Sequence, residues 1–376
     1  MTSVSPDLPS RHPRRGLRHA LAGLLLMLVS QAVLAMSVVF LNPGKSDEKF
    51  WLSVSQFMAA AGDSLGIELE VLYAERDATR MIGNARRVVA RTRRPDYLVA
   101  VNEKQVAAEI LRLTMGSGIK VFLINNTLNR EERSATGAPR QGMPHWIGSL
   151  VPNNEDAGYR MARQIIDAGQ QRFGAGQRLP MLAICGDRGT AAGLEREAGL
   201  RRALAEQPMA ELRQVVYGEW NQARAREQAA ILFKRHPDTR LVWCANDLMA
   251  FGAMEAAVAA GLQPGRDVFF SGLNNSPEAM QALRDGRLTA LASGHFSTGA
   301  WALVMLYDFH HGRDFAAVGP IERSEPLFVM LTPGQAERFL EWQAAARPSG
   351  LDFKAFSRVH HPELRDYRFS ILPFLQ

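Results

Sequence analysis

The sequence lacks the short motifs that mark common metal and cofactor sites. Only 2 of its 376 residues are cysteines, and they do not form a CxxC pair. There is no GxGxxG loop and no Walker lysine, the motifs that bind dinucleotides and nucleoside phosphates. Histidines that share a metal on one helix face are four residues apart, whereas the paired histidines here are adjacent, as His310-His311 and His360-His361. We therefore predict no catalytic residue, no metal and no cofactor.

Positive charge is also scarce once the N-terminus is set aside. The formal net charge is +6, and four arginines with one aspartate in the first 35 residues account for half of it. The remaining excess is too small and too scattered to indicate a polyanion partner. We therefore predict no nucleic-acid partner.

The N-terminus has the organisation of a secretory signal. Arg11, Arg14, Arg15 and Arg18 precede an apolar run over residues 20–34, which ends in Val-Leu-Ala at 33–35. A basic segment, a short apolar segment and small residues in that order are typical of a signal peptide. We predict cleavage after Ala35 and export of the mature chain to the periplasm. An uncleaved membrane anchor is the alternative, but about 15 apolar residues fall short of the roughly 20 that span a bilayer.

Export permits disulfides, so the state of the two cysteines is an open question. Cys185 and Cys244 each end a short apolar run, at residues 181–185 and 241–244. Free cysteines are among the most buried residues of a protein core. Two buried thiols are therefore favoured over one bridge.

From residue 37 the chain alternates short apolar runs with longer helical patterns, which is typical of parallel α/β sheets with helices on both faces. The first set of strands is expected at 37–41, 67–73, 97–101 and 120–124, with helices at 47–65, 79–91 and 104–115. A polar loop, 129–144, and a short run, 145–150, follow. The second set of strands is expected at 181–185, 212–217, 240–244 and 267–271, with helices at 191–206, 222–235, 248–260 and 276–285. A helix capped by Asn153 or Asn154 separates the two sets.

The predicted fold is thus two doubly wound parallel-sheet lobes joined by hinge strands that cross over between them. We assign 36–149 with 294–325 to the N-terminal lobe and 150–293 with 326–335 to the C-terminal lobe. Later pieces, a strand at 288–292, a helix at 298–311 and an extended segment at 326–331, complete these lobes. Residues 336–376 form a C-terminal extension, with a helix over 333–346 and an aromatic-rich tail. The tail either packs on the body or serves as a docking arm for a partner.

Amide and aromatic residues follow the predicted strands, at the end where open α/β sheets bind ligands. Amides both donate and accept hydrogen bonds, and aromatic faces stack on apolar ring faces, which suits a small polyhydroxylated ring. A single asparagine at such a position is more often a helix cap. The repeated pattern predicts a shared ligand cleft. Its residues are Asn42, Phe50, Trp51, Asn125, Asn126, Trp220, Asn246 and Asn274.

Three segments give the chain a family resemblance: Asn42 with Phe50-Trp51, residues 189–196, and the run CANDLMAFG at 244–252. With them the chain resembles the type I periplasmic sugar-binding proteins of the ribose-binding kind, from about residue 37 to about residue 331. The Ala-Asn-Asp-x-Met-Ala-x-Gly run is fairly specific to this superfamily, which includes lactose-repressor-type regulators. Those regulators begin with a DNA-binding helix-turn-helix, and the export signal here excludes that branch.

The resemblance implies two lobes that close on one ligand across three crossover strands. It implies that Phe50 and Trp51 stack on one ring face and that Trp220 contributes from the other lobe. The polar contacts that it implies are Asn42, Asn125 and Asn126 from the first lobe and Arg196, Asn246 and Asn274 from the second, with Ser293 or His295 in addition.

Three positions depart from the ribose-type pattern, which usually has Asp at Asn125, Arg at Asn126 and Asp at Asn274. Without these two carboxylates, the positive charge of Arg196 has fewer negative charges near it to compensate it, and charges in closed clefts need partners. The hypothesis is a ligand that is not ribose and is less hydroxyl-rich or partly anionic.

The predicted function is that of a non-enzymatic periplasmic solute-binding protein that captures a small carbohydrate-like ligand by hinge closure and delivers it to an ABC permease. The alternative is a periplasmic co-receptor that reports ligand occupancy to a membrane sensor kinase, because the segment after Thr332 exceeds the usual sugar-binding pattern. A periplasmic enzyme with the same fold is the third and least favoured hypothesis.

Overall fold

The computed structural model describes residues 1–3, 35–344 and 351–375. The basic and apolar segments of the predicted signal peptide lie outside the described residues, and cleavage after Ala35 stays a prediction. The chain divides into two compact units, Met1–Ala35 and Met36–Gln376.

The first lobe is built on a parallel six-stranded sheet in the order β11-β5-β4-β3-β1-β2. Alternate residues of its strands enter two different cores: Val38 and Phe40 pack in one, Val39 and Leu41 in the other. Both faces are therefore covered, which explains the continuous apolar runs. The strands are β1 (Ser37–Asn42), β2 (Glu68–Tyr73), β3 (Tyr97–Ala100), β4 (Lys120–Ile124), β5 (Trp146–Pro152) and β11 (Glu322–Glu325).

The second lobe repeats the arrangement with the order β12-β10-β9-β8-β6-β7. Its strands are parallel except β12, which runs antiparallel to β10. The strands are β6 (Leu179–Cys185), β7 (Ala210–Tyr217), β8 (Leu241–Cys244), β9 (Phe269–Leu273), β10 (Ala290–Ser293) and β12 (Val329–Met330).

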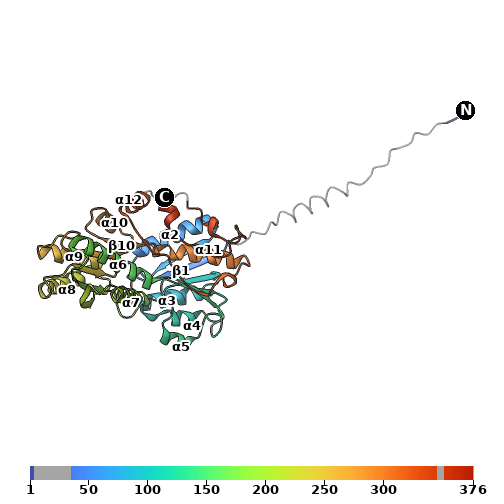
Figure 1. Ribbon diagram of the computed structural model, residues 1–376. Coiled ribbons are helices and arrows are strands. Elements are labelled where there is room, and N and C mark those ends of the chain that lie inside the picture. The colour runs from blue at the N-terminus through green and yellow to red at the C-terminus, as the bar shows by residue number, and fades with distance from the viewer. Residues whose placement is uncertain (4–34, 345–350, 376) are drawn as a thin grey trace. The chain divides into compact units, whose positions relative to one another are not determined.

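The helices divide between the lobes as the strands do. Figure 1 shows the green and yellow helices of the second lobe grouped on the left, and the orange α11 lying against the blue α2. The helices of the first lobe are α2 (Lys49–Leu65), α3 (Ala78–Val89), α4 (Ala107–Thr114), α5 (Arg130–Thr136) and α11 (Thr298–His310). Those of the second are α6 (Asn154–Phe173), α7 (Ala191–Glu206), α8 (Gln222–Arg235), α9 (Asp247–Ala259) and α10 (Pro277–Arg284).

The chain passes between the two sheets three times: after β5, between β10 and α11, and between β11 and β12. These passages are the expected crossovers, and the two doubly wound lobes confirm the predicted fold class. The first sheet continues to Pro152 in β5, past the predicted lobe boundary at residue 149. Short 3-10 turns occur at Glu103–Gln105 (η1), His295–Ser297 (η2), Phe315–Val318 (η3), Phe353–Phe356 (η4) and Leu372–Leu375 (η5).

One α-helix and one strand were not predicted. The expected loop 129–144 contains α5, which a capping box stabilises: the Asn129 side chain accepts from the Glu132 N–H at 2.9 Å, and the Glu132 carboxylate accepts from the Asn129 N–H at 2.8 Å. Strand β11 has the sequence Glu-Arg-Ser-Glu, which carries no apolar pattern, and it forms as an edge strand paired with β5. The last predicted helix is described as α12 (Pro333–Ala344), and residues 345–346 lie outside the described residues.

The tail after α12 packs on the first lobe. The side chains of Phe353, Tyr367 and Phe369 are buried, and Phe353 and Phe369 pack around Trp301 of α11 with ring centroids 5.4 and 5.0 Å away. Further along α11, Asp308 accepts four hydrogen bonds from residues 357–367. These aromatics belong to the core, so they do not form the exposed docking arm that was the alternative.

Both cysteines are buried and free of a disulfide, as favoured. Ile184 pairs with Cys244 across β6 and β8. Because side chains alternate along a strand, Cys185 faces the opposite side of the sheet from Cys244. Burial raises the pKa of both thiols.

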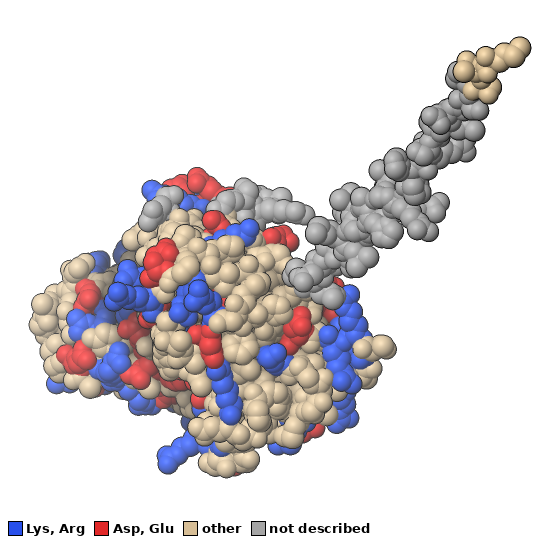
Figure 2. Space-filling view, turned by 90° about the vertical axis from the view of Figure 1, so that its right-hand side faces the viewer, with Lys and Arg blue, Asp and Glu red and all other residues tan. Residues whose placement is uncertain are grey.

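Charge on the surface is mixed. Figure 2 shows Lys and Arg side chains interspersed with Asp and Glu on the face drawn. Within the described ranges, no helix combines the length and apolar character needed to cross a bilayer.

Candidate functional site

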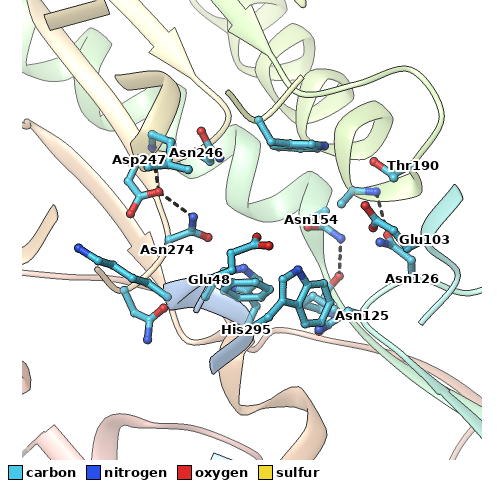
Figure 3. A pocket seen from close by; sticks show the side chains of 18 of the residues that line it. Glu48, Glu103, Asn125, Asn126, Asn154, Thr190, Asn246, Asp247, Asn274 and His295 are labelled. Carbon is cyan, nitrogen blue, oxygen red and sulfur yellow. Dashed lines mark hydrogen bonds between the residues drawn. The ribbon is translucent and has the colours of Figure 1, made fainter. Parts of the chain in front are cut away.

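A cavity of about 310 Å³ lies between the two lobes, at the carboxyl ends of their strands. This volume is at the small end of the range for ligand sites. Figure 3 shows Asn125 and Asn126 on one side and Asn246, Asp247 and Asn274 on another. Residues far apart in the sequence thus share one cleft.

Aromatic rings form part of the wall. Phe50 and Trp51, in the first turns of α2, meet edge to face with centroids 5.0 Å apart. Phe50 also stacks on His295 of η2 at 4.5 Å. Trp220 follows β7 in the second lobe, where its indole N–H donates to Asp187. Its φ is +60°, a conformation uncommon outside glycine, so the turn fixes this ring at the cleft.

Arg196 of α7 is the most deeply buried cation of the cavity wall, at 5% exposed. Nε donates to Oδ1 of Asn154 at 3.0 Å, and Nη1 donates to the Ala245 carbonyl at 3.0 Å. The guanidinium carbon lies 5.5 Å from the Trp220 ring centroid and 5.7 Å from that of Phe328. Burial lowers the pKa of Arg196 to about 10, which still leaves it charged near neutral pH.

Neither polar side-chain atom of Asn125 has a hydrogen-bond partner among the described residues. Asn125 follows β4 with φ of +61°, and its Nδ2 and Oδ1 are both buried without a hydrogen bond. Buried polar groups are nearly always paired, so each exception requires an explanation. Since Asn125 lines the cavity, a polar group of a ligand would satisfy both atoms.

Asn126 connects the two lobes directly. Its Oδ1 accepts from the Ala192 N–H, at the start of α7, at 3.2 Å. Lys49 of α2 and Glu278 of α10 form a second, solvent-exposed bridge between the lobes. The lobes are therefore in contact across the cleft in this arrangement.

The carboxylates of the cavity are bonded within the protein. Arg76 donates to both Glu48 and Glu103, and burial raises the pKa of Glu103, with Asp187 and Glu48 adding to the effect. Asp247 accepts from Ser276 Oγ at 2.6 Å and from Asn274 Nδ2 at 2.7 Å. Its burial likewise raises its pKa.

His295 lies in the second crossover, between Phe50 and Phe328, whose centroids are 4.5 and 5.0 Å from its own. Its Nδ1 is buried without a partner. Burial, with a contribution from Arg196, lowers the pKa of His295 well below its usual value. The imidazole is therefore neutral near pH 7.

Two of the predicted site residues lie away from the cavity wall. Asn42 is fully buried, and its side chain is occupied by Trp51 O, Ser55 Oγ and the Gly44 N–H, so it holds the loop after β1 in place. Ser293 is also fully buried, in β10, and its hydroxyl has no partner. The predicted residues on the wall are Phe50, Trp51, Asn125, Asn126, Arg196, Trp220, Asn246, Asn274 and His295.

Sequence reasoning missed several residues of the wall. Asn154 was expected only as a candidate helix cap, yet its Oδ1 positions Arg196. Glu48, Arg76 and Glu103 come from three different connections of the first lobe, and no spacing links them. Asp247 directly follows Asn246, and its position at the start of α9 could have indicated it.

One serine has the letter pattern of a hydrolase nucleophile. Residues 62–66 read Gly-Asp-Ser-Leu-Gly, and a GxSxG nucleophile lies on a sharp strand-to-helix turn. Ser64 instead lies in the last turn of α2, where its Oγ accepts a hydrogen bond from the Phe353 N–H at 3.1 Å. It serves to attach the tail. In the part of the chain that the structure describes, no cluster of three His, Cys, Asp or Glu side chains could hold a metal ion.

Comparison with known proteins identifies relatives of the whole fold. A sequence profile described as "periplasmic binding protein domain" matches residues 38–314. The ribose import binding protein of Escherichia coli strain K12 is 23% identical over 262 residues, which is 70% of this chain and 80% of that protein. The D-allose-binding periplasmic protein of the same organism is 30% identical over 126 residues, 33% of this chain and 40% of that protein.

Two solved structures are also similar to this chain. A periplasmic sugar-binding protein from Pseudomonas fluorescens is 46% identical, with a TM-score of 0.81 over 91% of this chain and 100% of the other. A galactofuranose-binding protein is 18% identical with a TM-score of 0.67, covering 82% of this chain and 98% of the other, so it shares the fold.

Proposed function

This chain belongs to the periplasmic binding protein family, and we propose that it captures a small sugar or sugar-like ligand between its lobes and delivers it to an ABC importer. The observation that carries the proposal is the cavity of about 310 Å³ walled by both lobes. Among the described residues, both side-chain polar atoms of Asn125 and Nη2 of Arg196 have no hydrogen-bond partner there.

Closure around the ligand explains why the wall is shared. A ligand that contacts both lobes stabilises the closed arrangement over the open one, because only the closed cleft offers both sets of contacts. The Asn126–Ala192 hydrogen bond and the Lys49–Glu278 bridge contribute to the same arrangement. The relatives named above are binding proteins for sugars, and their size and fold support the same role here.

The proposal includes export to the periplasm, with cleavage after Ala35. N-terminal sequencing of the protein recovered from the periplasmic fraction tests the cleavage site.

The sensor-kinase alternative depended on the length of the chain after Thr332. The burial of Phe353, Tyr367 and Phe369 against the first lobe gives that tail a structural role, so import is the favoured function.

Mass spectrometry of small molecules that copurify with the exported protein, released by mild denaturation, tests the proposal directly. We expect a monosaccharide-sized polar compound, returned chemically unchanged when it is added back. Calorimetric titration with that compound then measures the Kd. A protein that carries nothing and binds no sugar, sugar acid or sugar derivative would contradict the proposal.

Replacement of Trp220 tests the shared wall. Trp220→Ala should weaken ligand binding by about 1 to 3 kcal/mol, because a buried stacking surface is lost. Trp220→Phe keeps a ring and should lose less. An unchanged Kd in Trp220→Ala would show that this side chain has a packing role only.

A further inference from the structure

Several of the polar groups that the cavity still offers to a ligand are hydrogen-bond donors. Nδ2 of Asn126 and Nδ2 of Asn246 have no hydrogen-bond partner among the described residues, since each side chain uses only its oxygen. The indole nitrogen of Trp51 and Nδ2 of Asn125 are buried without partners. A neutral sugar presents hydroxyl groups that must also donate, so a wall rich in donors favours a ligand with surplus acceptors.

Arg196 adds a charge to these donors. Of its three nitrogens, Nε and Nη1 donate to Asn154 and Ala245, and Nη2 has no partner within the described chain. Both groups that it contacts are uncharged oxygens, and no carboxylate of the described residues forms an ion pair with it. A buried cation without a paired anion is costly, and a ligand carboxylate would compensate it.

The acidic residues nearby are engaged elsewhere. Glu48 and Glu103 share Arg76, and Asp247 bonds Ser276 and Asn274. Lys49, the third cation of the wall, is paired with Glu278.

Glu195, next to Arg196 in the chain, accepts from Asn154 at 3.3 Å instead of bonding the guanidinium, and burial raises its pKa. Glu195 therefore acts on Arg196 only at a distance and through Asn154, and no carboxylate of the described residues bonds the guanidinium directly.

We propose that the ligand is a sugar acid of monosaccharide size, whose carboxylate pairs with Arg196 while its ring packs between Trp220 and the Phe50–Trp51 wall. This inference rests on the proposed function and narrows it. The planar guanidinium matches the geometry of a carboxylate better than that of a single hydroxyl. The hydroxyl groups of the same ligand find acceptors in Asn125 Oδ1 and in Glu103 Oε2, which has no hydrogen-bond partner among the described residues.

Calorimetric titration of the purified full chain with matched pairs tests the inference. The probes are galactose and galacturonate, glucose and glucuronate, and mannose and mannuronate, with the methyl ester of each acid as an uncharged analogue of similar shape. We expect at least one acid to bind 10-fold or more tightly than both its neutral sugar and its ester. A neutral sugar or an ester that binds as tightly as its acid would overturn the inference and leave the proposed function in place.

Two variants with one control separate charge from packing. Arg196→Gln should lower the preference for the acid over the ester to within about 2-fold, and Arg196→Lys, which keeps the charge but not the planar fork, should retain part of it. Arg202→Gln, on the same helix but exposed and paired with Glu155, should keep the full preference.

Arg196→Gln could fail to fold. The ratio of the Kd values of acid and ester, measured with the unmodified protein, therefore tests the preference for a carboxylate independently. A preference that survives in folded Arg196→Gln would overturn the assignment to Arg196. Absence of binding by every member of all three pairs, together with absence of a copurifying sugar, would overturn the proposed function and this inference with it.

Discussion

Asp308 and Asn125 are buried polar side chains of the same lobe, and their surroundings are opposite. Asp308, fully buried in α11, accepts from Ser357 Oγ at 2.5 Å, the Arg358 N–H at 2.8 Å, the Val359 N–H at 3.2 Å and Tyr367 Oη at 2.8 Å. Neither polar side-chain atom of Asn125 has a hydrogen-bond partner in the described part of the chain. Each Asp308 bond is made to the C-terminal tail, so the first arrangement is complete within the protein. Under the proposed function, a ligand completes the second arrangement.

The difference separates buried polar groups that stabilise the fold from buried polar groups that remain available to a ligand. A satisfied cluster stabilises the fold, and removal of its centre leaves several donors unpaired at a cost in stability. An unsatisfied group already carries that cost in the free protein, so its removal should affect binding far more than folding. Four changes test this contrast, from the largest expected effect to the smallest.

Deletion of residues 351–376 should prevent folding. It removes the buried side chains of Phe353, Tyr367, Phe369, Ile371 and Leu375, each worth about 1.5 to 3 kcal/mol, against a total stability of about 5 to 15 kcal/mol. Circular dichroism and limited proteolysis measure the result. Deletion of residues 1–35, which lie outside the unit Met36–Gln376, is the control and should leave the fold intact. A tail-less protein that folds and binds ligand would restore the docking-arm hypothesis.

Asp308→Ala should lower the free energy of unfolding by about 3 kcal/mol or more, because four donors lose their acceptor in a buried site. Urea denaturation measures the change. Asp238→Ala, at an exposed ion pair with Arg213, is the matched control and should cost less than about 0.5 kcal/mol. Equal costs for the two variants would show that the Asp308 cluster does not anchor the tail.

His295→Gln should flatten the pH dependence of stability on the acid side. Burial and Arg196 lower the pKa of His295 in the folded protein, so below about pH 6.5 the unfolded state binds a proton that the folded state does not. Stability that is fully present above that pH is lost as the pH falls, by up to about 1.4 kcal/mol per pH unit. Urea denaturation from pH 7.5 to 5 measures the slope in both proteins. Identical slopes would indicate that the folded imidazole accepts the proton as readily as the unfolded one.

Asn125→Gly should change the unfolding free energy by no more than about 1 kcal/mol, since it removes two unpaired atoms and glycine tolerates the positive φ of this position. Ligand affinity should nevertheless fall about 10-fold, because one or two hydrogen bonds to the ligand are lost. Calorimetry and denaturation of the same preparation measure both quantities. A large loss of stability with unchanged affinity would place Asn125 with Asp308 as a structural residue.

Much of the fold could be predicted because local rules and tertiary packing agree. Helices α7 and α8 begin and end where the sequence indicates, since Thr190 and Asn221 cap their first turns through hydrogen bonds to Gly193 N and Arg224 N. Strand β11 could not be predicted. Its residues carry no apolar pattern, and it becomes a strand only because β5 offers a free edge.

The cleft was predictable in outline but not in its chemistry. The rule that ligands bind at the carboxyl ends of parallel strands selects Asn125, Asn126 and Asn246 from the sequence alone. It selects Asn42 equally, and only the folded loop reveals that the Asn42 side chain is occupied by Trp51 O and Ser55 Oγ. Asn154 was missed because its effect acts through Arg196, a contact between two helices that no spacing predicts.

The order of apolar runs, helix caps and turns along the chain determines two parallel-sheet lobes by itself, because strand burial and helix capping depend on neighbours in sequence. Which polar atoms find partners depends on side chains brought together from distant segments, and only the tertiary structure decides that. Asp308 is satisfied by a tail about 50 residues further along the chain, whereas Nη2 of Arg196, between the two lobes, finds no partner in the described part of the chain. The proposed ligand site depends on the second condition.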